Sequence, residues 1–258
     1  MIYDASITKI LGIPPYSFFT LIGVVFASSL FILLLLKYDY NIHRYFKIFF
    51  LSTAGLLIGA KFFGFLTGLY GALANKEVIT LDTFLKTGIV FYGGLIGFLL
   101  SFLLICKIWN KQIEYRVVDL AVVCIPLFHF WGRLGCFFGG CCYGKETQSA
   151  FSIEYTTRIN EKIVTASRIP IQLVEAAVNI VIFIVLLKLL NVEKLKKNLI
   201  KTYLFMYAAI RIVLEFFRGD LVRGVWNGVS FSQVISIMII IICLISLFRK
   251  KENVYESV

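Results

Sequence analysis

Long apolar runs dominate the 258-residue sequence and restrict the folds that it can adopt. A helix needs about 20 apolar residues to cross the hydrocarbon core of a bilayer. A backbone in lipid must also satisfy its own hydrogen bonds, which favours helices over open strands. We therefore predict an all-α integral membrane protein with about seven spans, of which the sixth is the shortest, at approximately residues 16–36, 48–70, 88–106, 117–138, 170–190, 203–217 and 227–248. Since no repeat or linker divides the chain, we expect residues 1–258 to form one membrane domain.

The composition excludes a soluble globular protein. Hydrophobic residues make up 59% of the chain and charged residues 16%, against about 45–50% and about 25% in soluble domains. The formal charge of +11 would suggest a nucleic-acid partner for a soluble protein. In a membrane protein basic residues gather in cytoplasmic loops and at lipid headgroups, so we expect membrane lipids and no nucleic acid as partners.

The distribution of Lys and Arg predicts the orientation. Fourteen of the 26 basic residues lie in residues 37–47, 107–116, 188–201 and 249–258, and nine lie in the segments on the opposite side. Cytoplasmic loops carry the excess, so the N-terminus should lie outside and the C-terminus in the cytoplasm. We expect no cleavable signal peptide, because the residues before Tyr16 lack a basic start joined to a short apolar core.

Three basic residues lie inside the predicted spans and away from the span ends: Lys61, Arg133 and Arg211. A charge in a bilayer costs from about 3 to 10 or more kcal/mol, so it normally faces protein or water and has a partner. Each is therefore a candidate functional residue. The alternatives are a structural ion pair or a side chain that reaches the interface.

Arg211 belongs to a charged stripe on the sixth span. Glu215 and Arg218 follow it at the i+4 and i+7 positions, on the same helix face. The stripe is either a structural Arg–Glu pair or an anion site. An anion site is chemically reasonable because guanidinium presents a fork of donors to phosphate and a neighbouring carboxylate can orient it.

The fourth span carries a second stripe, formed by His129, Arg133 and Cys136 at the same spacing. Several glycines lie in and after this stripe, among them Gly135 and Gly144. A further glycine cluster opens the third span. Such glycines either allow close backbone approach and anion binding or serve helix packing. This further cluster contains Tyr92, Gly93 and Gly94.

The fifth span begins at Pro170, with Gln172 and Glu175 in its first turns. A carboxylate near a helix N-terminus is favoured by the helix dipole. Glu175 nevertheless lies deep enough to require a cationic partner. His43, by contrast, lies in a basic loop, where we expect it to be solvated.

Of the six cysteines, Cys136, Cys141 and Cys142 form a cluster, and the other three lie in apolar runs. The cluster has three interpretations: apolar packing, a disulfide on the oxidising outer face, or thiol or metal chemistry. No His/Cys set has zinc-finger spacing, so the spacing predicts no metal and no cofactor. Residues 151–169 alternate and carry β-formers, which suggests a small hairpin on the outer side.

Several motifs resemble, in the same order, those of the prolipoprotein diacylglyceryl transferase family of bacterial inner-membrane enzymes. They are IPPYSFFTLIG, GAKFFG, FYGGLIG, GRLGCFFGGCCYG, IPIQLVEA, FMYAAIRIVLEFFRGD and FSQVISI. The resemblance implies seven helices in the bacterial cytoplasmic membrane. It also implies transfer of a diacylglyceryl group from phosphatidylglycerol to the lipobox cysteine of a prolipoprotein signal peptide, with release of glycerol phosphate.

The resemblance assigns roles to individual residues. Arg133 and Arg211 would contact the phosphate, with Glu215 as partner. We add the hypothesis that His129 or Tyr92 assists removal of the acceptor proton. Further substrate-binding positions are Tyr16, Lys61, Gly93, Gly94, Gly135, Cys136, Gly144, Gln172, Glu175 and Arg218.

The sequence departs from the family pattern at a few positions. The family commonly has His at the position of Tyr92, Asn at Cys136, Arg at Lys61, and an acidic residue within the Cys141–Cys142 pair. The alternatives are therefore a related glycerolipid transferase with another acceptor and a non-catalytic lipid-binding or transport protein.

Overall fold

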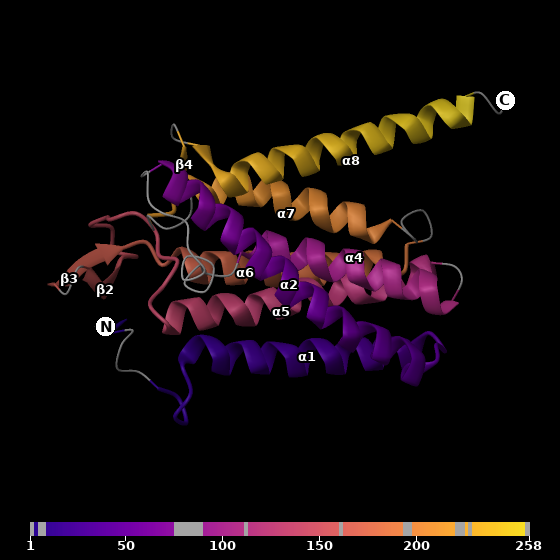
Figure 1. Ribbon diagram of the computed structural model, residues 1–258, viewed down its shortest axis with the longest axis horizontal. Helices are drawn as coiled ribbons and strands as arrows, with labels where there is room; N and C mark the ends of the chain where they lie inside the picture. Colours follow the sequence, from indigo (N-terminus) through magenta and orange to yellow (C-terminus); the bar gives the residue numbers. More distant parts are fainter. Residues whose placement is uncertain are drawn as a thin grey trace.

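The computed structural model describes residues 3–4, 9–74, 90–110, 113–159, 162–192, 198–219, 225–226 and 229–255. Within this part of the chain, seven helices alternate in direction along a bundle (Figure 1). Their bounds are α1 (Pro15–Lys37), α2 (Ile42–Ala74), α4 (Phe91–Asn110), α5 (Tyr115–Phe138), α6 (Ile171–Leu189), α7 (Leu199–Glu215) and α8 (Phe231–Tyr255).

Each predicted span coincides with one of these helices, although the ends differ by several residues. Five helices, α1, α2, α4, α5 and α6, are long and apolar enough to cross a membrane. Helix α7 has 17 residues, and Phe231–Ser246 of α8 form a shorter apolar helix. Residues 88–89 and 227–228 of the predicted spans lie outside the described residues. The protein is thus a mostly helical membrane protein.

Short strands lie beside the helices at one end of the bundle. Strands β2 (Ile153–Ile159) and β3 (Lys162–Arg168) form an antiparallel hairpin, which confirms the hairpin predicted for 151–169. Strand β1 (Tyr3–Asp4) pairs in parallel with β2. A second small pair, β4 (Val225–Trp226) and β5 (Val229–Ser230), precedes α8. We call this end of the bundle the sheet end (Figure 1).

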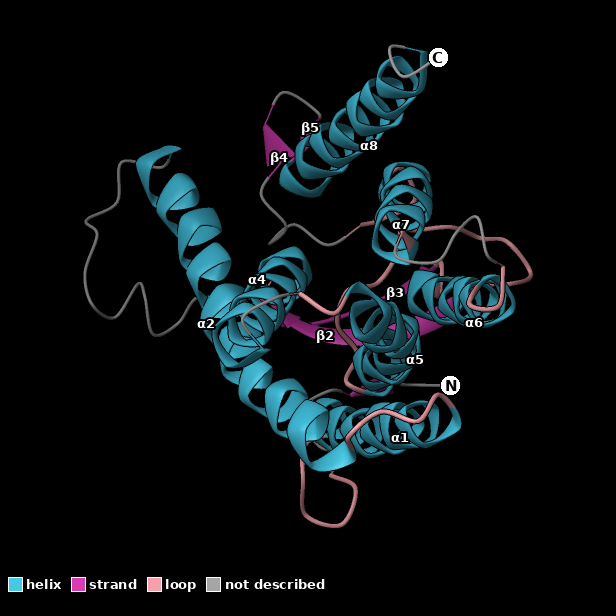
Figure 2. Ribbon diagram, turned by 90° about the vertical axis from the view of Figure 1, so that its right-hand side faces the viewer, coloured by secondary structure: helices cyan, strands magenta, loops and turns pink. Residues whose placement is uncertain are grey.

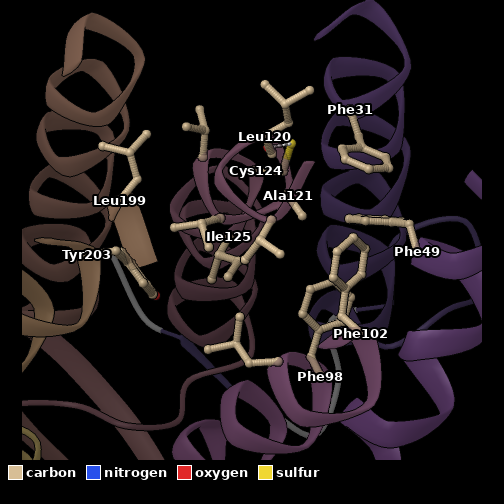
Figure 3. Packing of buried hydrophobic residues seen from close by; sticks show 14 of the residues in the cluster. Phe31, Phe49, Phe98, Phe102, Leu120, Ala121, Cys124, Ile125, Leu199 and Tyr203 are labelled. Carbon is tan, nitrogen blue, oxygen red and sulfur yellow. Dashed lines mark hydrogen bonds between the residues drawn. The ribbon is translucent and has the colours of Figure 1, made fainter. Parts of the chain in front are cut away.

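Helix α5 lies inside the bundle, between α1, α6 and α7, whereas α8 lies at the edge against α7 (Figure 2). Aromatic rings fill the space between α1, α2 and α4: Phe31 stacks on Phe49 at 4.6 Å between ring centroids, and Phe98 meets Phe49 edge-on at 5.3 Å (Figure 3). Cys124 is buried in the same core and acts there as a small apolar residue. Large apolar side chains also cover the outer faces of the helices, as in a bundle that faces lipid.

Helices α2 and α4 cross closely at glycines. A Cβ atom added at Gly93 would overlap the carbonyl oxygen of Gly59, and one added at Gly97 would overlap that of Gly55. Gly94 faces Ala60 of α2 at ordinary contact distance. Small residues at such crossings allow two helix backbones to approach in a membrane. Helix packing is therefore one role of Gly93 and Gly94, and their substrate-binding role stays a prediction.

Candidate functional site

Helices α5 and α7 end, and α6 and α8 begin, at the sheet end (Figure 1). Charged side chains from these helices form ion pairs there. Arg133 lies five residues before the end of α5, and Arg211 four residues before the end of α7. At 1.5 Å per residue these positions are about 6–8 Å inside the bundle. The charges are therefore held below the surface rather than on it.

The carboxylate of Glu175 on α6 is the centre of this cluster. Arg211 Nη1 donates a hydrogen bond to Glu175 Oε1 at 2.5 Å, and Arg133 Nε forms an ion pair with Glu175 Oε2 at 2.6 Å. Arg218 Nη1 lies 4.0 Å from Glu175 Oε1. Residues from three helices and the segment after α7 thus meet at one carboxylate. The cationic partner that the sequence required for Glu175 is present.

A second carboxylate, Glu215, orients Arg211 from the other side. Arg211 Nη2 lies 2.6 Å from Glu215 Oε2, as the i, i+4 spacing predicted. The hydroxyl of Ser232, in the first turn of α8, donates to Glu215 Oε2 at 3.0 Å, and Arg211 Nη2 donates to Ser232 Oγ at 3.3 Å. Arg211 is therefore fixed by partners from α6, α7 and α8.

The five charged groups carry a net positive charge in a buried place. Three guanidinium groups face two carboxylates, and every one of these residues is 7% exposed or less. Buried charges need hydrogen-bonded partners, because each has lost its hydration. One positive charge remains beyond those that the carboxylates balance, so the cluster can accept an anion such as a phosphate diester. The five residues that form this charged cluster are Arg133, Glu175, Arg211, Glu215 and Arg218.

Helix α6 places Glu175 through its first turns. Pro170 is the residue before the first helical turn, and its fixed φ suits the start of a helix. Gln172 and Glu175 follow on one face. Gln172 is fully buried and donates to the carbonyl oxygen of Cys141 at 2.7 Å, while Tyr155 of β2 donates to Gln172 Oε1 at 3.2 Å. Gln172 therefore joins the hairpin to the segment after α5.

His129 and Tyr92 are both buried and held by neighbouring side chains, unlike an exposed base. His129 Nε2 accepts a hydrogen bond from Arg133 Nε at 3.1 Å, and its ring stacks on Phe91 at 3.7 Å. Tyr92 is 2% exposed, and its hydroxyl lies 2.5 Å from Ser236 Oγ on α8. His129 thus positions Arg133, and Tyr92 joins α4 to α8.

Two glycines allow other segments to approach the cluster. A Cβ atom at Gly135 would lie 3.2 Å from the backbone of Tyr16, so Gly135 brings the start of α1 beside the end of α5. Gly144 donates from its backbone to the carbonyl oxygen of Ile169 at 2.9 Å and forms an isolated bridge with Arg218. Gly144 therefore helps to fix the backbone that carries Arg218.

Replacement of Gly144 by alanine is expected to destabilise the protein by about 1–3 kcal/mol, the usual cost of overpacking. The new Cβ atom would lie 2.6 Å from the carbonyl oxygen of Ile169, so the backbone has to shift. Thermal unfolding in detergent measures the effect. The control is Gly132→Ala, where nothing lies within 4 Å of the new atom, and where alanine should stabilise α5 by about 0.5–1 kcal/mol. Equal midpoints for Gly144→Ala and the unmodified protein would contradict this account.

The glycine pair after α5 brings three cysteine thiols together. Gly140 has φ of 64°, its amide donates to Phe137 O, and the amide of Cys141 donates to Cys136 O, each at 3.1 Å. This is the Schellman arrangement, in which a left-handed residue ends a helix and reverses the chain. Cys141 and Cys142 consequently return to Cys136, and all three sulfur atoms lie within 4.8 Å of one another.

The three thiols are unpaired and differ in exposure. Cys136 is buried, Cys142 is half-buried and Cys141 is exposed. Hydrogen bonds with Cys136 and Cys141 lower the pKa of the Cys142 thiol well below its ordinary value, and the nearby guanidinium groups lower it further. Burial opposes these effects. The exposure of Cys141 and the half-buried position of Cys142 differ from what simple apolar packing would give.

The chain matches a known family over nearly its whole length. A model of the family described as prolipoprotein diacylglyceryl transferase matches residues 5–249. The chain belongs to the prolipoprotein diacylglyceryl transferase family. The resemblance drawn from the sequence motifs is thus confirmed.

The relatives that carry the name phosphatidylglycerol–prolipoprotein diacylglyceryl transferase include the following three. The protein of Clostridium tetani is 30% identical over 222 residues, covering 83% of this chain and 86% of the relative. A second, numbered 2, from Clostridium perfringens is 30% identical over 233 residues, covering 90% and 88%. The protein of Hydrogenovibrio crunogenus is 30% identical over 201 residues, covering 75% and 73%. The similarity of this family member to these three relatives therefore extends over most of both chains.

The structure of this family member differs from the sequence-based site in two ways. Lys61 is half-buried on α2, which packs mainly along α4 rather than on α6, the helix that carries Glu175. Ser232 and Ser236, which the sequence analysis did not select, contact Arg211 and Tyr92. Both serines lie in the FSQVISI motif, which is one of the motifs that carry the family resemblance.

Proposed function

We propose that the protein transfers a diacylglyceryl group from phosphatidylglycerol to the cysteine thiol of a prolipoprotein, the activity for which its relatives are named. In this reaction a carbon–sulfur bond forms at the glycerol carbon. The bond between that carbon and the phosphate oxygen breaks. Its electron pair leaves with glycerol phosphate, and the thiol proton passes to solvent.

The observation that carries the proposal is the buried cluster around Glu175, which contains one more guanidinium than its carboxylates balance. Negative charge accumulates on the leaving phosphate as the carbon–oxygen bond breaks. Preorganised donors in a water-poor site stabilise such charge more than water does. Arg133 and Arg211 hold the phosphate, while Glu175 and Glu215 fix the two guanidinium groups.

The remaining residues position these groups. His129 and Gly144 support Arg133 and Arg218, respectively, and Gln172 fixes the segment that carries Cys141. Tyr16 lies beside Gly135 at the same end of the bundle, where it can contact lipid or the acceptor. Tyr92 takes no part as a base in this proposal.

We further propose that all seven helices cross the bacterial cytoplasmic membrane as one domain, with the sheet end outside. The excess of basic residues at the opposite end of the chain's helices supports this orientation. The cluster then lies about one helical turn below the outer surface, where lipid enters from the side. The lipobox cysteine of a signal peptide reaches it from the outer aqueous face.

The test is an assay of the purified protein with phosphatidylglycerol vesicles and a peptide that contains a lipobox cysteine. We expect a diacylglyceryl thioether on the peptide, detected by mass spectrometry, and free glycerol phosphate. The control peptide has serine in place of cysteine. Absence of product beside an active relative would reject the proposal. Lipid analysis of a deletion strain then separates another acceptor from a non-catalytic role, since only the former changes a glycerolipid conjugate.

A further inference from the structure

The thiols of Cys136, Cys141 and Cys142 form a site of their own beside the arginine cluster. Their sulfur atoms lie within 4.8 Å of one another. Zinc–sulfur bonds of about 2.3 Å in a tetrahedron place the sulfurs about 3.8 Å apart. Side-chain rotation alone can supply the small contraction that is needed. The three atoms therefore converge on one point that a metal ion can occupy.

The backbone fixes this convergence. The Schellman turn returns Cys141 over Cys136, and the Cys141 thiol lies 3.7 Å from the Cys136 carbonyl oxygen. Cys142 has φ of 58°, a left-handed conformation that costs a residue other than glycine about 1–2 kcal/mol. Gln172 holds the carbonyl oxygen of Cys141 from α6. Such supporting contacts orient the ligands of metal sites.

The exposure and charge of the cluster favour a site with one open position. Cys136 closes the inner side, and the exposed Cys141 marks the outer side. A divalent ion with three thiolates carries one negative charge, and Arg133 and Arg218 lie close enough to Cys142 to interact favourably with it. Three protein ligands with a free fourth position are typical of catalytic zinc, whereas structural zinc has four.

We propose that Cys136, Cys141 and Cys142 bind a zinc ion through their three sulfur atoms, and that the acceptor thiol takes the fourth position. The second part rests on the proposed function. Coordination to zinc removes the proton of a thiol, and this proton passes to solvent. The bound thiolate then forms the carbon–sulfur bond, while the electron pair of the broken carbon–oxygen bond leaves with the phosphate on Arg133 and Arg211.

The zinc site would generate the acceptor thiolate, a step for which the arginine cluster provides no group. Phosphate binding stabilises the leaving group but does not generate a thiolate. His129 is held by Arg133 and Phe91, and Tyr92 is held by Ser236, so neither is placed as a base. The cysteine spacing alone did not predict a metal, because the turn that joins the three thiols is a feature of the backbone. A disulfide between two of them would leave the third without a partner.

The first experiment measures metal binding by the full-length protein in detergent, without any substrate. We expect one zinc per chain by elemental analysis. With cobalt in its place, we expect a thiolate-to-cobalt charge-transfer band and tetrahedral d–d bands. Alanine at Cys136, Cys141 or Cys142 should remove both signals. Cys124→Ala, on the same helix as Cys136 but buried in the core, should retain them. Substoichiometric metal in the unmodified protein, or a disulfide within the cluster, would overturn the site.

The second experiment adds lipobox peptides to the cobalt-loaded protein without a lipid donor. The cysteine peptide should intensify the charge-transfer band, and the serine peptide should leave it unchanged. If the spectrum stays unchanged with a cysteine peptide that the protein does lipidate in the transfer assay, the metal is structural. That result would reject binding of the acceptor thiol to the metal. Metal binding without any lipid transfer would reject the proposed function and keep the metal site. The two failures are therefore distinguishable.

Discussion

Replacement of Arg211 by alanine is expected to lower diacylglyceryl transfer on the order of 10²–10³-fold, the usual loss when one preorganised donor to a developing charge is removed. Arg211 contacts Glu175, Glu215 and Ser232, so its guanidinium is fixed before substrate binds. Initial rates with phosphatidylglycerol and a lipobox peptide measure the loss. The effect should fall mainly on the rate at saturating lipid, because the charge on the phosphate grows in the transition state.

Two further variants separate chemistry from folding in this measurement. Arg211→Lys keeps the charge but not the planar fork of donors, so an intermediate rate is expected. Arg44→Ala removes an exposed arginine near the other end of the bundle, whose guanidinium donates to the carbonyl oxygen of Trp109, and should leave the rate unchanged. Full activity of Arg211→Ala, at unchanged thermal stability, would remove Arg211 from the reaction.

Replacement of Glu175 by glutamine is expected to have the largest effect on stability, a loss of about 3–5 kcal/mol, because it leaves buried guanidinium groups without their shared counter-charge. Arg133 and Arg211 both contact the Glu175 carboxylate, which is 3% exposed. Thermal unfolding in detergent should show a large fall in the midpoint. Transfer activity should fall as well, since the two arginines lose their fixed positions.

The matched control is Glu146→Gln, which changes an ion pair at the same end of the protein. Glu146 Oε1 lies 2.6 Å from Arg168 Nη2, but the Glu146 side chain is 66% exposed. Exposed ion pairs contribute about 0–1 kcal/mol, so the midpoint should hardly change. If Glu175→Gln were as stable as Glu146→Gln, the cluster would not depend on Glu175 as its central anion.

Local patterns in the sequence predicted those parts of the fold that depend on neighbouring residues. The apolar runs located the helices, and the alternation in 151–169 located the β2–β3 hairpin. The spacing of Arg211 and Glu215 predicted their ion pair, since residues four apart share a helix face. Helix periodicity and strand alternation act over a few residues and can be recognised without tertiary structure.

Contacts between helices could not be predicted in the same way. The sequence indicated that Glu175 needs a cation, but the packing of α5, α6 and α7 decided that Arg133 and Arg211 meet there. The same limit applies to Gly93 and Gly94. Their motif fits a binding loop or a helix crossing equally well, and only the approach of α2 distinguishes the two.

The sequence by itself therefore determined a membrane-embedded helical protein, its family and most of the charged residues at its site. Only the tertiary structure decided that these charges surround one carboxylate, that Ser232 completes the contacts of Arg211, and that three thiols converge beside them. The physical reason is that a residue's helix face follows from its neighbours in the chain. Its partner across the bundle depends on how distant helices pack, and the partner of Cys136 depends on a single left-handed turn at Gly140.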